Sequence, residues 1–289
     1  MVDSSGGASV SSTIALMTAV LGDVDEAKDL LALVQDMPKH WAHLAGDEPL
    51  EEFEVRIAME SAARRARGMP MQYAARRAHF RHLTLSVDER ALIPRPETEL
   101  LVDLVLEATR GEPGGVVADV GTGTGAVALA LATEGRFAQV IATDVSMDAL
   151  AVAAENADRY LDTVMGHLEL RHGHLLEPVT ERGLRAVVSN PPYIAYGEAG
   201  DLPPLVRDWE PSVALFAGDN GNAVASAIIR DAAPVLAPGG ILALEVDTRR
   251  AAELAHVAER NGAYEAVRVV QDLSGRDRFV VAKRREDTR

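Results

Sequence analysis

The stretch VVADVGTGTGAVALALA, residues 116–132, decides the fold. Its apolar first part suits a buried strand, and its alanine- and leucine-rich end suits a helix. Between them, Gly121, Gly123 and Gly125 let the backbone approach a ligand without a Cβ atom in the way. Ligands of open α/β sheets bind at the carboxyl ends of strands, so this strand–turn–helix predicts a binding site at one edge of such a sheet.

Strands and helices are predicted to alternate through the rest of the chain. Seven strands are expected, at 115–121, 138–144, 167–173, 184–190, 239–246, 264–270 and 278–283. Helices are expected between them, at 124–133, 147–160, 222–236 and 250–262. This alternation predicts an α/β fold with a mostly parallel sheet covered on both faces. The last two strands follow each other without a helix, so one of them is expected to run antiparallel.

The part before this sheet has a different character. Residues 1–12 suggest a disordered tail, and 13–77 show the three- and four-residue apolar spacing of a small helical domain. Residues 78–95 suggest a β-hairpin linker, with strands at 80–87 and 90–93 around the turn Asp88–Glu89. The sheet domain is therefore expected over 96–289, starting with a helix at 97–108.

Composition excludes several classes of protein. The chain has 289 residues and a formal net charge of −15, from 29 basic and 44 acidic side chains, which argues against a general nucleic-acid binder. It has no cysteine and no cluster of metal-ligand residues, so neither a disulfide nor a metal site is expected. Without a leader peptide or an apolar run of roughly 20 residues, we expect a cytoplasmic protein. The arginine-rich run at 64–81 suits either a solvated face or a patch for an acidic partner.

The glycine turn is followed by an acid at the end of the next strand. Asp144 lies 19 residues after Gly125, where its carboxylate can accept hydrogens from both ribose hydroxyls of an adenosine. Two ligands fit the turn. Gly121, Gly123 and Ala126 satisfy a loose dinucleotide pattern, whereas Asp119 with the three glycines fits the S-adenosylmethionine loop, which we favour.

A second corner, NPPY at 190–193, follows the fourth strand and is expected beside the glycine turn. The lone pair of a planar amide or amino nitrogen is delocalised, so such a nitrogen reacts poorly unless it is held in place. The Asn190 side-chain oxygen and the Pro191 carbonyl can accept its two N–H hydrogens, and Tyr193 can pack over the flat group. Pro192 stiffens the corner. The tetrapeptide alone leaves open whether a nucleobase or a glutamine is methylated.

Several separated motifs carry a family resemblance. They are GMPMQY (68–73), ALIPRPETELLVD (91–103), GTGTG (121–125), NPPYI (190–194), EPSVALFAGDNG (210–221), LAPGGILALEV (236–246) and DLSGRDRFVV (272–281). In this order they resemble the release-factor glutamine methyltransferases, which implies a Rossmann-like class I methyltransferase sheet with an N-terminal substrate-docking domain. The implied reaction is N5-methylation of the glutamine in the Gly-Gly-Gln loop of peptide chain release factors. The implied donor is S-adenosylmethionine, which leaves as S-adenosylhomocysteine.

The resemblance also implies the site residues. The catalytic residues would be Asn190, Pro191 and Tyr193, and the substrate glutamine would meet Asn190, Pro191, Pro192 and Tyr193. The donor would contact Gly121, Thr122, Gly123, Thr124, Gly125, Asp144, Leu175 and Asn190. A monomer without membrane or nucleic-acid contacts is expected, with release factors as its partners.

Two alternatives stay open beside this interpretation. One is an adenine-N6 nucleic-acid methyltransferase, and the other is a glutamine methyltransferase acting on a ribosomal protein. The segment PRPETE at 94–99 favours release factors and would help to close the pocket. The sequence departs from the family pattern at Arg76, His82, His174, Asn220 and Asp247.

Overall fold

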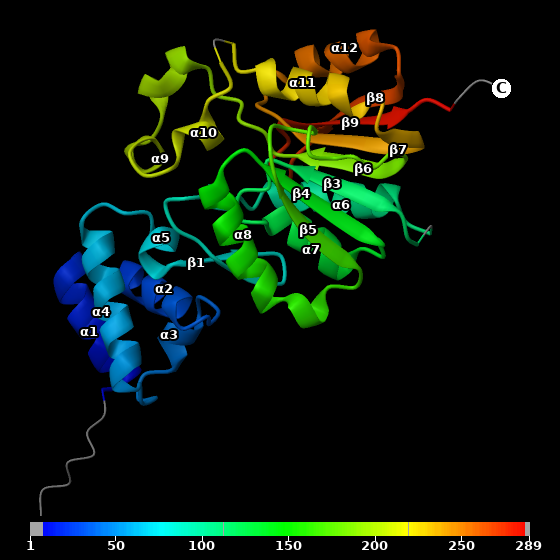
Figure 1. The fold of residues 1–289 in the computed structure, drawn as a ribbon. Helices are drawn as coiled ribbons and strands as arrows, with labels where there is room; N and C mark the ends of the chain where they lie inside the picture. The colour runs from blue at the N-terminus through cyan, green and yellow to red at the C-terminus, as the bar shows by residue number, and fades with distance from the viewer. Residues whose placement is uncertain (1–7, 112, 219, 287–289) are drawn as a thin grey trace, which may run out of the picture.

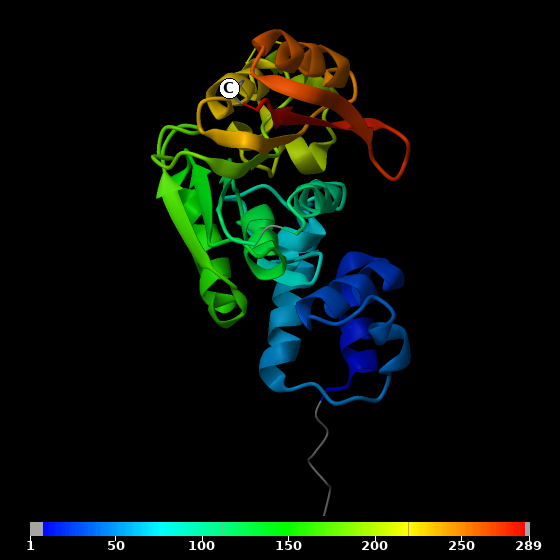
Figure 2. The same cartoon turned by 90° about the vertical axis from the view of Figure 1, so that its right-hand side faces the viewer.

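The computed structural model describes residues 8–111, 113–218 and 220–286. Figure 1 shows a group of helices at the N-terminal end, a short hairpin, and a large twisted sheet covered by helices. The view in Figure 2 shows that the N-terminal helices form a unit beside the sheet rather than a layer on it. No helix in these described ranges is long and apolar enough to span a bilayer.

The sheet holds the expected strands in the order β5-β4-β3-β6-β7-β9-β8. They are β3 (Val116–Val120), β4 (Gln139–Asp144), β5 (His167–His172), β6 (Leu184–Ser189), β7 (Leu236–Glu245), β8 (Tyr264–Gln271) and β9 (Asp277–Arg284). Only β9 runs antiparallel to its neighbours β7 and β8 in this sheet, as expected for one of the last two strands. The strand order reverses between β3 and β6, and a ligand crevice forms at such a switch point.

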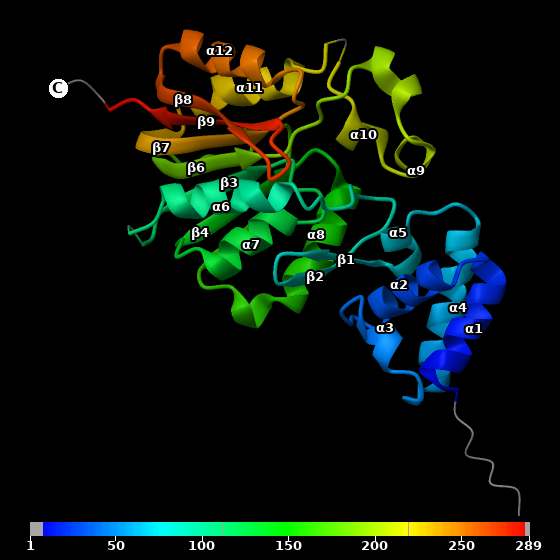
Figure 3. The same cartoon turned by 180° about the vertical axis from the view of Figure 1, so that it is seen from behind.

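Helices cover both faces of the sheet, and the strand residues alternate between the two cores. Ala186 and Val188 of β6 pack with α6 (Thr98–Ala108) and α7 (Ala126–Glu134), which lie side by side in Figure 3. Val187, between them, packs with α11 (Ala223–Ala232) and α12 (Ala251–Asn261) on the opposite face. A fifth helix, α8 (Met147–Arg159), follows β4. Because successive side chains point to opposite faces, an apolar strand can supply both cores.

The N-terminal unit contains more helix than expected. It comprises α1 (Val10–Leu21), α2 (Val24–Val34), α3 (Trp41–Leu44), α4 (Glu52–Ala66) and α5 (Met71–Ala75). The tail expected over 1–12 was wrong in its last part, because Ser9 caps α1 and exchanges bonds with Ser12. A serine capping box satisfies amide groups that would otherwise be unpaired, and so starts the helix. Residues 1–7 lie outside the described residues.

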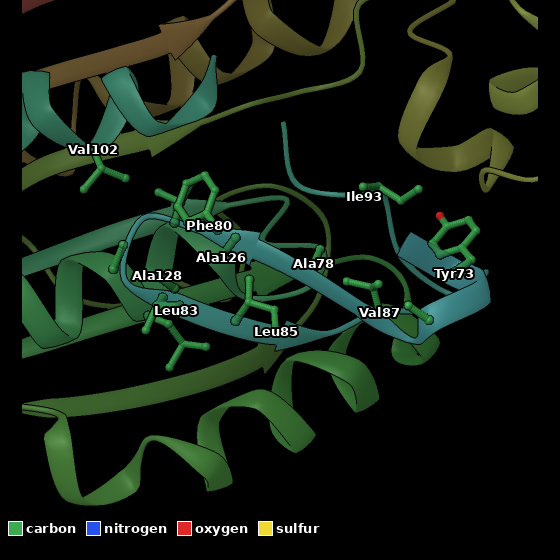
Figure 4. Packing of buried hydrophobic residues seen from close by; sticks show 14 of the residues in the cluster. Tyr73, Ala78, Phe80, Leu83, Leu85, Val87, Ile93, Val102, Ala126 and Ala128 are labelled. Atoms are coloured by element: carbon green, nitrogen blue, oxygen red, sulfur yellow. The ribbon is translucent and has the colours of Figure 1, made fainter. Parts of the chain in front are cut away.

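The linker hairpin exists, but its turn was predicted in the wrong place. Its strands are β1 (Arg77–Phe80) and β2 (Leu83–Ser86), and residues 90–93 belong to no strand. Arg81 at the turn has a left-handed backbone (φ 54°) and its side chain bonds Glu134 of α7 at 2.6 Å. Figure 4 shows the apolar side of the hairpin against α7, with Phe80, Leu83 and Leu85 near Ala126 and Ala128. These contacts with a distant helix fix the turn.

The arginine-rich run serves mainly to join these parts. Arg64 donates to the Ala74 carbonyl at 2.9 Å, and Arg65 pairs with Glu26 at 2.7 Å. Arg77 donates to the Val34 carbonyl, and Arg81 binds α6 and α7. These four side chains therefore act inside the protein, and neither a purely solvated face nor a free basic patch describes the run.

Side chains of α8 and of Tyr160, the residue after it, make hydrogen bonds to the free edge of the hairpin. Buried Asn156 accepts from the Ser86 amide at 2.7 Å and donates to the Ser86 carbonyl at 3.0 Å. It also donates to the Thr124 carbonyl at 2.9 Å. Tyr160 makes the equivalent pair of bonds with the backbone of Thr84. Asn156 thus links the hairpin to the glycine turn.

We expect Asn156→Ala to lower the free energy of unfolding by about 3 kcal/mol, because one buried and two partly buried backbone groups lose their hydrogen-bond partner. The control Asp158→Ala alters an exposed position of the same helix and should change stability by less than about 0.5 kcal/mol. Urea denaturation of the three proteins measures the difference. Equal midpoints for both variants would contradict the role given to Asn156.

Candidate active site

A cavity of about 360 Å³ lies at the carboxyl ends of β3, β4 and β6. Five of the eight predicted donor-binding residues line it: Gly121, Gly123, Asp144, Leu175 and Asn190. They come from segments up to 69 positions apart in sequence, and the topology brings them to the switch point between β3 and β6. Pro191 and Pro192 line the same cavity.

The glycine turn is shaped for close approach of a ligand. Gly121 and Gly123 have φ angles of 73° and 57°, and a Cβ atom at either position would meet no protein atom within 4 Å. A side chain there would be strained and would occupy the open space at the cavity. Gly125 differs, since its Cβ would lie 3.3 Å from Ala153 of α8. Gly125 therefore serves the packing of two helices.

Asp144 is locked to the turn. One carboxylate oxygen accepts from the Gly123 amide and the other from the Ser146 amide, both at 2.9 Å. The acid therefore sits beside the glycines at a fixed orientation. Leu175 lies near the end of β4, where its carbonyl accepts from Thr143 at 2.8 Å and its own φ is 49°.

The threonines of the turn do not line the first cavity. Thr122 and Thr124 line a smaller adjoining hollow of about 50 Å³, which shares Gly121, Gly123 and Asn190 with it. The Thr122 hydroxyl donates to Asp119 at 2.7 Å, and the same carboxylate oxygen accepts from the Ala128 amide at 3.1 Å. Burial raises the pKa of Asp119 to about 7 although both bonds lower it. This carboxyl group ties β3 to the first turn of α7.

The raised pKa of Asp119 gives stability a pH dependence. The folded state keeps this proton up to about pH 7, whereas the unfolded state keeps it only up to about pH 4. The free energy of unfolding therefore falls as pH rises through this window. Asp119→Asn keeps an oxygen for both bonds and removes the charge. We expect the variant to lose less stability than the wild type between pH 5 and pH 8, as measured by chemical denaturation. Parallel pH profiles for the two proteins would contradict this assignment.

The NPPY corner separates the first cavity from a second one of about 290 Å³. Asn190 and Pro191 line both cavities, as do Leu92 and Ala214. Tyr193 lines only the second of the two, and burial raises the pKa of its hydroxyl. Asn190 and Pro191 thus lie between the two cavities.

The hydrogen bonds of Asn190 leave its oxygen available. Its amide nitrogen donates to the Thr98 hydroxyl at 3.1 Å, and that hydroxyl donates to Glu245 at 2.7 Å. Among the described residues, no donor is bonded to the Asn190 side-chain oxygen or to the Pro191 carbonyl. Two unbonded acceptors therefore belong to residues that line both cavities.

Comparison with known proteins identifies the family. Over 269 residues the chain is 39% identical to the release factor glutamine methyltransferase of Gloeobacter violaceus, covering 92% of this chain and 93% of that protein. It is 41% identical over 241 residues to the protein of the same name from Deinococcus radiodurans, covering 83% of each. The chain belongs to the release factor glutamine methyltransferase family. The resemblance seen in the sequence motifs is confirmed.

Two further comparisons concern the methyltransferase fold. The family model described as "Methyltransferase small domain" matches residues 96–201. A crystal structure of a methyltransferase from Pyrococcus furiosus matches with a TM-score of 0.52 at 18% identity, covering 82% of this chain and all of that one. The predicted Rossmann-like class I methyltransferase sheet is confirmed.

Two departures from the family pattern lie in one ionic network of this methyltransferase. Glu198 pairs with Arg249 at 3.0 Å and with Arg250 at 2.8 Å. Asp247 pairs with Arg249 at 2.9 Å, and Arg250 also donates to the Asn220 carbonyl at 2.9 Å. The network holds the 3-10 helix η2 (Tyr196–Asp201) to the end of β7.

The other three departures have different surroundings. Arg76 ends α5 in a left-handed conformation. His82 bonds Thr133 at 3.0 Å and lies 3.2 Å from Glu134. His174 lines the first cavity with 64% of its side chain exposed, and a nitrogen of its ring is 3.8 Å from Glu177. Of these three, only His174 lines either cavity.

Sequence reasoning missed parts of the site. Arg90, Ala91 and Leu92 line the first cavity, and buried Tyr73 of α5 donates to the Ala91 carbonyl at 2.7 Å. Short helices α9 (Pro204–Arg207) and α10 (Ser212–Leu215) border the second cavity through residues such as Val206 and Leu215. The sequence did contain a signal for Glu245, because it is a charged residue within the otherwise apolar run ILALEV.

An ion pair joins two of the family motifs. A single guanidinium nitrogen of Arg95 lies 2.6 and 2.7 Å from the two oxygens of Glu210, whose side chain is 2% exposed. Burial raises the pKa of Glu210, and Arg95 opposes that shift. The pair fastens PRPETE to the segment before α10, beside the second cavity.

Proposed function

We propose that this methyltransferase transfers a methyl group from S-adenosylmethionine to the side-chain nitrogen of the Gly-Gly-Gln glutamine in a peptide chain release factor. One observation carries the proposal: the paired acceptors of Asn190 and Pro191 lie where two cavities meet. Relatives that share 39–41% of their residues with this chain and bear the release factor name support the substrate.

The first cavity suits the donor. S-adenosylmethionine supplies a methyl group on a sulfonium, which is a good leaving group. Asp144, beside Gly121 and Gly123, would accept the ribose hydroxyls, and Leu175 would line the adenosine part. Of the proposed donor residues, Thr122, Thr124 and Gly125 would act by shaping the turn, because they do not line this cavity.

The second cavity would receive the glutamine side chain. The Asn190 oxygen and the Pro191 carbonyl would each accept one N–H of the amide, which aims its nitrogen at the first cavity. These dipoles also stabilise the positive charge that develops on the nitrogen. Tyr193 would pack on the amide plane and Pro192 would stiffen the corner. As the nitrogen forms a bond to the methyl carbon, the bond from that carbon to sulfur would break and its electron pair would stay on sulfur, which leaves S-adenosylhomocysteine. The nitrogen would then lose one proton to water.

The remaining assignments follow from this substrate. The helical unit over 13–77 would dock the release factor, and the hairpin linker over 78–95 would hold that unit beside the catalytic domain over 96–289. Because translation takes place there, the protein is proposed to act in the cytoplasm. A monomeric state, and the absence of direct nucleic-acid and membrane contacts, stay predictions.

We expect Asn190→Ala to lower the rate of methyl transfer on the order of 100-fold, because one of the two orienting acceptors is lost. Donor affinity should change only a few-fold. Transfer of a labelled methyl group and calorimetry with S-adenosylhomocysteine measure the two effects. Asn261→Ala, at an exposed position, is the matched control. Normal turnover by the Asn190 variant would contradict the mechanism.

The substrate itself is tested by mass spectrometry. Purified release factor should gain one methyl group, about 14 Da, on the Gly-Gly-Gln glutamine after incubation with the protein and donor. A ribosomal protein and adenine-containing DNA and RNA form the comparison arms. Methylation of an arm other than the release factor, with the release factor unmodified, would overturn the proposed substrate.

A further inference from the structure

We propose that Thr98 and Glu245 are positioning residues that orient the side-chain amide of Asn190, so that its oxygen and not its nitrogen faces the substrate. This inference rests on the proposed function, because it assigns a purpose to the orientation of a residue in that site. It gives PRPETE a role through its threonine, beyond the closing of the pocket expected for this segment.

The orientation matters because an asparagine amide has nearly the same shape either way round. With the oxygen toward the second cavity, Asn190 accepts a hydrogen from the substrate amide. With the nitrogen there, two N–H donors would face each other and no bond would form. A flip of about 180° about the last side-chain bond would therefore remove an acceptor without altering packing.

The Thr98 hydroxyl decides which way the amide lies. It has one hydrogen, which it donates to Glu245 at 2.7 Å, and it is buried. An ionised Glu245 has no hydrogen to offer, so the bond can run in only one direction. Thr98 can then only accept from Asn190, at 3.1 Å, and this places the amide nitrogen on the side of Thr98.

The three residues come from three different elements of the sheet domain. Thr98 is the first residue of α6, Glu245 is the last residue of β7, and Asn190 follows the end of β6. The chain of two hydrogen bonds therefore crosses the carboxyl edge of the sheet. In such a buried chain, each bond polarises the next and fixes the direction of the whole.

The burial of the Glu245 carboxyl group disfavours folding, and this supports a functional reason for its presence. It is 2% exposed, and within the described ranges it has no ion pair within 4 Å. A buried carboxylate without a paired cation is rare and disfavours folding. The charged and titratable groups around it are Arg278 and Arg95, which favour its ionised form, and Glu97 and Tyr193. Burial outweighs the cations and raises its pKa to about 7.

The pKa supplies a readout that a merely structural role would not give. Above about pH 7 Glu245 is ionised and the chain runs from Asn190 to Glu245. Below that pH, a protonated Glu245 can donate to Thr98, and Thr98 is then free to donate to the Asn190 oxygen. The transfer rate should fall as pH decreases through about 7.

The experiment compares conservative variants with a release factor as substrate. Thr98→Val keeps the shape and removes the hydroxyl, and we expect kcat to fall about tenfold or more with donor affinity unchanged. Thr98→Ser restores the hydroxyl and should restore most of the rate. Glu245→Gln keeps an oxygen for Thr98 and removes the ionisation, so the fall in rate near pH 7 should disappear. Thermal denaturation confirms that each variant is folded.

The outcomes separate this inference from the proposed function. If Asn190→Ala is inactive, but Thr98→Val keeps the wild-type kcat, the positioning role is overturned and the proposed function stands. An unchanged pH profile in Glu245→Gln, or no rescue by Thr98→Ser, also overturns it. If Asn190→Ala itself is fully active, the result contradicts the proposed function, whatever the Thr98 variants show.

Discussion

Two acceptors, the Asn190 side-chain oxygen and the Pro191 carbonyl, must stay unbonded to the protein at the junction of two cavities. An acceptor in a partly buried corner would normally find a partner. Proline has no N–H, so Pro191 and Pro192 supply no backbone donor here. Thr98 binds the only donor group of the Asn190 side chain. The rest of the site can be understood as support for this one arrangement.

That support comes from parts of the chain that are far apart in sequence. The switch point between β3 and β6 sets the glycine turn next to NPPY. Tyr73 of the helical unit holds Ala91 at the first cavity, and Arg95 holds Glu210 beside the second. Asn156 joins the hairpin to the backbone of the turn. Each link is a polar contact that adds to the apolar packing of these elements.

Sequence predicted what depends on local pattern and missed what depends on distant contacts. The seven strands followed from apolar runs, and the turn at Gly121 followed from its glycines. The hairpin turn was misplaced because Arg81 is held by Glu134 of a distant helix. Thr98 and Glu245 were missed because they are 147 positions apart and meet only in the folded chain. The hydroxyl of Thr122 binds buried Asp119, a contact that its place in the glycine motif does not indicate. The assignment of Thr122 to the donor stays a prediction.

Residues that line the first cavity lie on both sides of the boundary at residue 96. The segment matched by the methyltransferase family model begins at residue 96, but Arg90, Ala91 and Leu92 belong to the connection before it. A fragment cut at that boundary would lack three residues that line the first cavity. The helical unit and the sheet domain are therefore not interchangeable modules. Any change in one of them must be compatible with a linker that also lines the first cavity.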